Sequence, residues 1–271
     1  VGVDNINIPV ATRKGIVVIN TPEVNTISAA EHTIGMMLSL ARNIPEGHLG
    51  IKQGNWNRHG LVGVELRGKT LGIVGMGKIG REVMNRCKSF QMNIIAYDPF
   101  LTQEMFNVDD LKLVDLDSLI RESDFITLHL PINNKTRNLF NLDKLKLMKP
   151  TSVIINVARG GIINENDLST ALNNDIISGA AIDVFLHEPL DPKHKLIQTK
   201  NIILTPHLGA STREAKEGVS IGICESVKDF LIESKLSGAL NIPLNDFSKL
   251  NELAPFLDLA EKLGTTQAHF T

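Results

Sequence analysis

The stretch TLGIVGMGKIGREVMNRCKSFQMNIIAYD, residues 70–98, decides the fold class of this chain. It predicts an apolar strand, a helix with apolar residues at helical spacing, and a second apolar strand. Gly75, Gly77 and Gly80 join the first strand to the helix. Glycines in this position allow a tight turn, a close approach of the backbone to a diphosphate, and close packing of helix on strand. The N–H groups at a helix N-terminus also favour a phosphate. The stretch therefore predicts a parallel β-α-β unit with a dinucleotide at its turn.

The second strand of this unit ends in Asp98, 18 residues after Gly80. A carboxylate at this place accepts hydrogen bonds from the adenosine ribose and repels the 2′-phosphate of NADP. We therefore expect NAD as the cofactor. The competing interpretation is an ordinary glycine turn beside a surface aspartate, with no cofactor. Strand, turn, helix and acid all fall in the required order, which favours NAD.

Apolar segments rich in Ile and Val continue the pattern beyond this unit, with helical patterns between them. Six strands are expected, at residues 70–75, 93–98, 124–129, 152–157, 177–184 and 201–206. Strands and helices that alternate at this spacing form right-handed β-α-β connections and a parallel sheet. The expected fold class is α/β, with a doubly wound parallel Rossmann-type sheet.

Two long helical patterns flank the sheet, at 28–43 and 212–234, and the first opens with Ser28 and Glu31 at the spacing of a capping box. Near the start of the chain, VGVDNI and GIVVINTP are typical of the last strands of another, smaller α/β lobe. We expect an NAD-binding domain over 22–210, parts of an incomplete, flavodoxin-like substrate domain at 1–21 and 211–234, and the truncated start of a further domain at 235–271.

Composition excludes several classes of partner. The chain has 271 residues, a formal net charge of −2 and only 4% aromatic residues, which argues against nucleic acid or an anionic membrane as the main partner. No apolar run approaches the length that spans a membrane. The two cysteines, Cys87 and Cys224, have no metal-binding spacing and suggest no disulfide framework. We expect a cytoplasmic protein without a metal ion.

Three ionisable residues follow three of the predicted strands: Arg159, Glu188 and His207. The carboxyl ends of parallel strands form the crevice in which such sheets bind ligands. A guanidinium anchors a carboxylate in bidentate geometry. An imidazole exchanges a proton near neutral pH, and a neighbouring carboxylate favours its charged form and fixes its tautomer. These residue types together predict hydride transfer between a 2-hydroxy acid and the nicotinamide, with His207 as the acid or base.

Each of the three residues also has an ordinary structural interpretation when it is taken alone. Arg159 could bind a backbone carbonyl, Glu188 could lie in a solvated turn, and His207 could be a buried histidine with a satisfied ring. Their common position at the ligand edge of a nucleotide-binding sheet favours the catalytic interpretation. His129 and His187 also lie near strand ends. We assign neither a catalytic role, because His207 already supplies the imidazole.

The motifs GMGKIG, NVARGG, HEP and PHLGAST, with Asp98 in place, resemble the D-isomer-specific 2-hydroxyacid dehydrogenase family, and the resemblance runs from residue 1 to about 234. It implies that Arg159 binds the substrate carboxylate, that His207 is the acid–base residue, and that Glu188 is its partner. It also implies NAD contacts from Gly75, Gly77, Lys78, Ile79, Gly80, Asp98, Leu130, Val157, Ala158, Arg159, Asp183, His207, Leu208, Gly209 and Ala210. Family members associate through the cofactor domain, so we expect a homodimer or homotetramer in which residues 54–63 form part of a dimer arm.

Finer details are similar to the branch of the family that oxidises 3-phospho-D-glycerate to 3-phosphooxypyruvate, the first step of L-serine biosynthesis. The expected substrate is thus a small phosphorylated 2-hydroxy acid. The resemblance implies that basic residues for the phosphate precede the chain as given, which we therefore expect to turn over poorly by itself. Two alternatives stay open: a glyoxylate or hydroxypyruvate reductase of the same family, and an NADH-sensing corepressor of the same fold.

Overall fold

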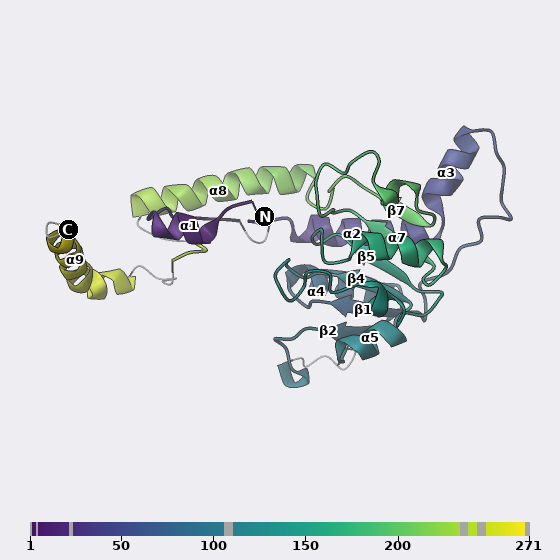
Figure 1. The fold of residues 1–271 in the computed structure, drawn as a ribbon, viewed down its shortest axis with the longest axis horizontal. Coiled ribbons are helices and arrows are strands. Elements are labelled where there is room, and N and C mark those ends of the chain that lie inside the picture. The colour runs from purple at the N-terminus through teal and green to yellow at the C-terminus, as the bar shows by residue number, and fades with distance from the viewer. Residues whose placement is uncertain are drawn as a thin grey trace. The chain divides into compact units, whose positions relative to one another are not determined.

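The computed structural model describes residues 2–3, 5–21, 24–105, 111–233, 238–242 and 248–268 (Figure 1). The chain divides into two compact units. One consists of residues 26–212 and the other of residues 1–25 and 213–271. Each unit is described by itself below.

A parallel sheet forms the centre of the unit 26–212. Within the described residues it has seven strands in the order β3-β2-β1-β4-β5-β6-β7. The strands are β1 (Thr70–Val74), β2 (Asn93–Tyr97), β3 (Lys112–Leu113), β4 (Phe125–Leu128), β5 (Val153–Asn156), β6 (Gly179–Ile182) and β7 (Ile202–Leu204). All neighbouring pairs are parallel. The chain runs outward from β1 in one direction to β3 and in the other to β7, so the prediction of a doubly wound parallel sheet is confirmed.

The strand β3 was not among the six expected strands. It pairs with β2 through Lys112 and Leu113, which lie beside Ile95 and Ala96. Two residues are too few to show a hydrophobic period, and the sheet edge at which this strand lies demands no continuous apolar run. The other six strands lie within the expected segments, each shorter by one to four residues at its ends.

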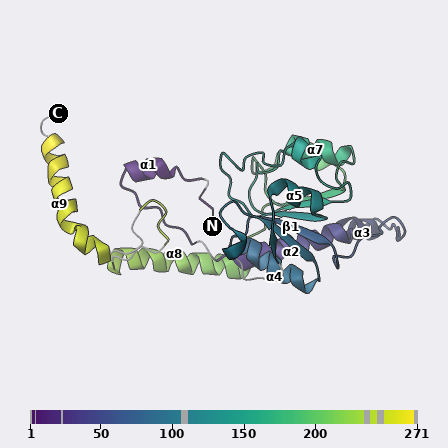
Figure 2. The ribbon, with the colours of Figure 1, turned by 90° about the horizontal axis from the view of Figure 1, so that it is seen from below.

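Helices cover both faces of the sheet (Figure 2). On one face pack α2 (Thr26–Ala41) and α4 (Lys78–Ser89), and on the other pack α5 (Leu116–Glu122), α6 (Leu142–Leu145) and α7 (Glu165–Asn173). Side chains alternate along the strands accordingly: Ile73 and Ile155 join the core under α2 and α4, whereas Val74 and Ile154 join the opposite core. Both cores are apolar, which fixes the strand register from which the site is built.

The first long helix differs from its prediction at both ends. α2 begins at Thr26, so Ser28 lies inside its first turn, where its hydroxyl is 2.8 Å from that of Thr212. The expected capping box is therefore wrong. α2 ends at Ala41, and Asn43, with a φ of 51°, turns the chain into a second helix, α3 (Ile44–Lys52), which has Pro45 in its first turn. Pro45 thus starts a new helix rather than only ending the first.

The unit of residues 1–25 and 213–271 contains α1 (Ile8–Arg13), α8 (Arg213–Glu233) and α9 (Ser248–Ala268). The expected strand GIVVINTP appears only as an isolated antiparallel bridge between Ile19 and Ala239. VGVDNI falls partly outside the described residues, and its described part carries no strand. The assignment of residues 1–21 and 211–234 to a substrate domain, and of 235–271 to a further domain, stays a prediction.

The short 3-10 helices η1 (Gln103–Met105) and η2 (Lys195–Gln198) complete the described secondary structure. Among the helices of the described residues, none combines the length and the apolar character that a membrane span requires.

Candidate active site

The glycine turn between β1 and α4 has the geometry that a dinucleotide site needs. Gly75 has a φ of +100°, which favours glycine, and its N–H donates to Tyr97 O at 2.8 Å. A Cβ on Gly80 would lie 2.2 Å from Gly75 O, so α4 can pack this closely only because residue 80 is a glycine. A Cβ on Gly77, the N-cap of α4, would instead meet nothing within 4 Å. Open space therefore adjoins the start of α4, where backbone N–H groups favour a diphosphate.

The structure places Asp98 directly beside this turn. One carboxylate oxygen accepts the N–H of Met76 at 2.9 Å, and the other accepts the N–H of Phe100 at 2.9 Å. Asp98 therefore ties the end of β2 to the glycine turn of β1. A negative charge fixed at this point suits ribose hydroxyls and disfavours a second phosphate.

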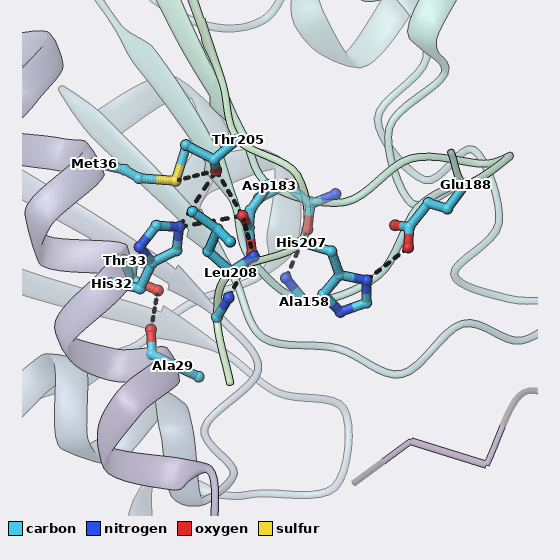
Figure 3. Close-up of polar contacts among 12 residues, drawn as sticks. Ala29, His32, Thr33, Met36, Ala158, Asp183, Glu188, Thr205, His207 and Leu208 are labelled. Carbon is cyan, nitrogen blue, oxygen red and sulfur yellow. Dashed lines mark hydrogen bonds and ion pairs between the residues drawn. The ribbon is translucent and has the colours of Figure 1, made fainter. Parts of the chain in front are cut away.

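His207 and Glu188 contact each other at the carboxyl edge of the sheet. The Nδ1 atom of His207 lies 2.7 Å from Oε2 of Glu188, and the two side chains point toward each other (Figure 3). The other carboxylate oxygen, Oε1, accepts the N–H of Phe185 at 2.9 Å. The imidazole is about half exposed, with 48% of its side chain accessible. Because Glu188 occupies Nδ1, proton exchange with a substrate would use Nε2.

His207 adopts a strained backbone conformation, with a φ of +55°. Asp183 holds the turn in this shape. The carbonyl oxygen of Asp183 accepts the N–H of His207 at 2.8 Å, and its carboxylate accepts the N–H groups of Leu208 and Gly209 at 2.8 and 2.9 Å. Backbone strain of this kind persists where surrounding contacts over-determine it, and it is frequent at active sites.

Asp183 is fully buried, yet the pKa of its carboxyl group stays below the ordinary value. Burial opposes the charge, but hydrogen bonds from His32, Thr205 and the two backbone N–H groups outweigh it and hold the pKa of Asp183 below its ordinary value. The Thr205 hydroxyl lies 2.5 Å and Nε2 of His32 lies 3.1 Å from the same oxygen, Oδ1 (Figure 3). The carboxylate predicted to contact NAD is thus occupied by groups of the chain itself.

Sequence reasoning missed His32 and Asn156. His32 lies on α2, 151 residues before Asp183, and only its helical spacing to Met36 hinted that it faces the sheet. Asn156, at the end of β5, is 2% exposed and shapes the turn that carries Arg159. Its amide nitrogen donates to Arg159 O at 2.9 Å, and its amide oxygen accepts the N–H of Ala158 at 3.0 Å. The signal available in the sequence was that Asn156 is a polar residue at the end of an otherwise apolar strand.

Arg159 therefore lies at the carboxyl end of β5, in a turn built by Asn156. One guanidinium nitrogen, Nη1, donates to Ala158 O at 2.6 Å. The next residue, Gly160, packs against the loop that leads to Glu188, because a Cβ there would lie 1.9 Å from Phe185 O. The Arg159 turn and the Glu188 loop are thus in direct backbone contact.

The remaining predicted NAD contacts lie at the same edge of the sheet or at the start of α4. Lys78 and Ile79 form the first turn of α4, Leu130 follows β4, Val157 and Ala158 follow β5, and Ala210 follows the His207 turn. His129 also lies there, with Nε2 3.0 Å from the Thr127 hydroxyl, and burial lowers its pKa to about 3. His187 is exposed. Over the described part of the chain, no group of three or more His, Cys, Asp or Glu residues could hold a metal ion.

Comparison with known proteins identifies the family. A family model described as D-isomer specific 2-hydroxyacid dehydrogenase, NAD binding domain, matches residues 34–209. The D-3-phosphoglycerate dehydrogenase of Synechocystis is 50% identical over 265 residues, which cover 98% of this chain and 48% of that protein. The chain thus spans about half the length of the curated relatives it matches.

Solved structures agree with this match. An NAD-dependent formate dehydrogenase of Staphylococcus aureus, in complex with NAD, has a TM-score of 0.82 at 33% identity, over 89% of this chain and 73% of that chain. A glyoxylate reductase of Paecilomyes thermophila has a TM-score of 0.82 at 32% identity, over 88% of this chain and 72% of that one. The chain belongs to the D-isomer specific 2-hydroxyacid dehydrogenase family, and residues 34–209 are its NAD-binding domain.

Proposed function

We propose that the protein containing this chain oxidises 3-phospho-D-glycerate to 3-phosphooxypyruvate with NAD, as the first step of L-serine biosynthesis. The observation that carries the chemistry is the contact of 2.7 Å between His207 and Glu188, at the carboxyl edge of an NAD-binding sheet. The choice of substrate is supported by 50% identity to a D-3-phosphoglycerate dehydrogenase, against 32% to a glyoxylate reductase.

In this proposal Arg159 binds the substrate carboxylate through its guanidinium, which places the C2 hydroxyl against His207. Nε2 of His207 takes the hydroxyl proton, and Glu188 stabilises the imidazolium that forms. NAD, when bound, accepts the hydride from C2. In the reverse direction His207 returns the proton to the carbonyl oxygen.

The cofactor would be held by the residues around the glycine turn and the carboxyl edge. Open space at Gly77 suits the diphosphate, and the Asp98 carboxylate suits the adenosine ribose. The role that we propose for Asp183 differs from the expected direct contact. Its carboxylate holds the turn of Leu208 and Gly209, so it would act on the nicotinamide end mainly by fixing that turn.

We also propose that two copies of the protein associate through α3 and the loop at 54–63, here called the α3 arm. Figures 1 and 2 show the α3 arm projecting from its unit. It exposes Leu49, Ile51, Trp56 and Val62, and Trp56 and Val62 are 83% and 82% accessible. An apolar surface of this kind marks an interface, and the family resemblance favours a second copy as the partner.

A cytoplasmic location completes the proposal. Both cysteines are free thiols, Cys87 buried and Cys224 exposed. Free thiols accord with a reducing compartment.

The experiment that tests the function uses the natural full-length protein. We expect it to form NADH from 3-phospho-D-glycerate and NAD, and to reduce 3-phosphooxypyruvate with a higher kcat/KM than glyoxylate or hydroxypyruvate. Arg159→Lys keeps the charge but loses the bidentate fork, so the KM for the hydroxy acid should rise by roughly 10- to 100-fold while the KM for NAD holds. Arg121→Lys, an exposed change on α5, is the control.

Faster reduction of glyoxylate than of 3-phosphooxypyruvate would contradict the proposed substrate and would favour the alternative function as a glyoxylate reductase. NADH binding without turnover of any of these acids would favour the corepressor. An unchanged KM in Arg159→Lys would remove Arg159 from the carboxylate site.

A further inference from the structure

The loop between β6 and Glu188 is hydrogen-bonded to the carboxylate of Glu165, which has no role in the proposed chemistry. Glu165 is the first residue of α7, and its Oε1 atom accepts the N–H of Leu186 at 2.6 Å. The side chain of Glu165 is 13% exposed. A largely buried carboxylate that accepts a backbone N–H makes one of the stronger kinds of hydrogen bond in a protein.

The neighbouring backbone N–H belongs to the proposed catalytic system. Phe185, one residue before Leu186, donates its N–H to Oε1 of Glu188, and Oε2 of Glu188 contacts His207. Two successive N–H groups are therefore bound by two carboxylates, one from α7 and one from the site. Whatever holds Leu186 in place also sets where the Glu188 carboxylate is anchored.

Glu165 is itself oriented by a histidine. Nδ1 of His194 accepts the N–H of Leu196 at 3.4 Å, so Nε2 carries the proton and donates to Oε2 of Glu165 at 3.1 Å. His194 is the N-cap of η2. Each oxygen of Glu165 thus has one donor, and its rotamer is fixed from both sides.

The same loop also packs against the turn that carries Arg159. Gly160 leaves no room for a Cβ, because Phe185 O would lie 1.9 Å and Leu186 N 2.6 Å from it. The Phe185–Leu186 backbone is therefore held between Gly160 on one side and Glu165 on the other. A shift of this backbone would displace the Arg159 turn and the Glu188 carboxylate together.

We propose that Glu165 is a positioning residue of the dehydrogenase site, which sets the alignment of Glu188 with His207 by holding the Leu186 N–H. This inference rests on the roles proposed above for His207 and Glu188. Glu165 acts only through the loop and touches neither substrate nor cofactor in this account.

The test is done in the natural full-length protein. Glu165→Ala should lower kcat by about 10- to 100-fold, because small displacements of catalytic groups have effects of this size, with the KM for NAD unchanged. Glu188→Gln removes the carboxylate that stabilises the imidazolium, so it should lower kcat as well. Glu165→Gln keeps an oxygen that can accept the Leu186 N–H and loses only the acceptor for His194, so its kcat should lie clearly above that of Glu165→Ala.

Asp167→Ala is the matched control. Asp167 lies in the same first turn of α7, and its carboxylate also accepts a backbone N–H, that of Leu142 at 3.0 Å, away from the site. Both alanine variants should lose thermal stability, but Asp167→Ala should keep the kcat of the parent. If Glu165→Ala does not fold, Glu165→Asp replaces it, since the shorter side chain withdraws the acceptor from Leu186.

The outcomes separate the two claims. Equal kinetics in Glu165→Ala and Asp167→Ala, with Glu188→Gln strongly impaired, would overturn the positioning role and leave the proposed function intact. An unimpaired Glu188→Gln would overturn the proposed function itself. A kcat of Glu165→Gln no higher than that of Glu165→Ala, with normal folding, would also contradict the inference, because the Leu186 contact would then not be what matters.

Discussion

His129, directly after β4, is kept neutral by its surroundings, because burial lowers its pKa from 6.5 to about 3. In the unfolded chain the same imidazole titrates normally, so between pH 6.5 and 3 the unfolded state binds a proton that the native state excludes. The contribution of neutral His129 to the free energy of unfolding is therefore fully present above pH 6.5, and it is lost as the pH drops through this window. The free energy of unfolding should fall between pH 8 and pH 5.5 by about 1 kcal/mol more in the parent than in His129→Gln.

Denaturant unfolding at the two pH values measures this difference. His187→Gln, at an exposed histidine, should behave as the parent does. Equal pH dependence in the parent and His129→Gln would show that burial does not set the ionisation of His129.

At this scale the sequence predicted the contact between His207 and Glu188 but not the groups that support it. Residue type and a place at a strand end suffice to nominate Arg159, Glu188 and His207. The contacts of His32 with Asp183 and of Glu165 with Leu186 depend on how helices pack against the sheet. Such contacts join residues 151 and 21 positions apart, and no local pattern reports them.

At the scale of elements, the turn from β1 to α4 carries a prediction that separates packing from binding. Gly80→Ala places a Cβ 2.2 Å from Gly75 O, so it should lower the melting temperature. Gly77→Ala meets nothing within 4 Å and has a φ of −67°, so the fold should tolerate it. The added methyl group would instead fill the space that we assign to the diphosphate, and NAD affinity should fall.

Thermal unfolding and titration with NADH fluorescence test both variants together. A destabilised Gly77→Ala, or a Gly77→Ala with normal NAD affinity, would contradict the assignment of the diphosphate to this space.

The elements themselves were predicted where their hydrophobic pattern is long. α8 lies within one residue of its expected ends at 212 and 234, since it shows several turns of helical spacing. β3 and the break before α3 were missed for the opposite reason. A strand of two residues has no period, and the break depends on the single left-handed residue Asn43.

At the scale of the whole molecule, the proposed association of two copies through the α3 arm can be tested. Trp56→Glu combined with Val62→Glu places charges on the exposed apolar surface and should shift the protein to a smaller assembly, as measured by analytical ultracentrifugation. Met105→Glu, at an exposed apolar residue of η1, is the control and should leave the assembly unchanged. An unchanged assembly in the double variant would place the interface elsewhere.

We propose that His207, aligned by Glu188, moves the proton while NAD supplies the acceptor for the hydride. The most direct measurement is the rate of NADH formation from 3-phospho-D-glycerate by the full-length protein and by His207→Asn, with NADH binding recorded for both. Loss of a general base should lower kcat by at least about 100-fold, while NADH still binds. Turnover of His207→Asn at a rate close to that of the parent would show that His207 is not the base.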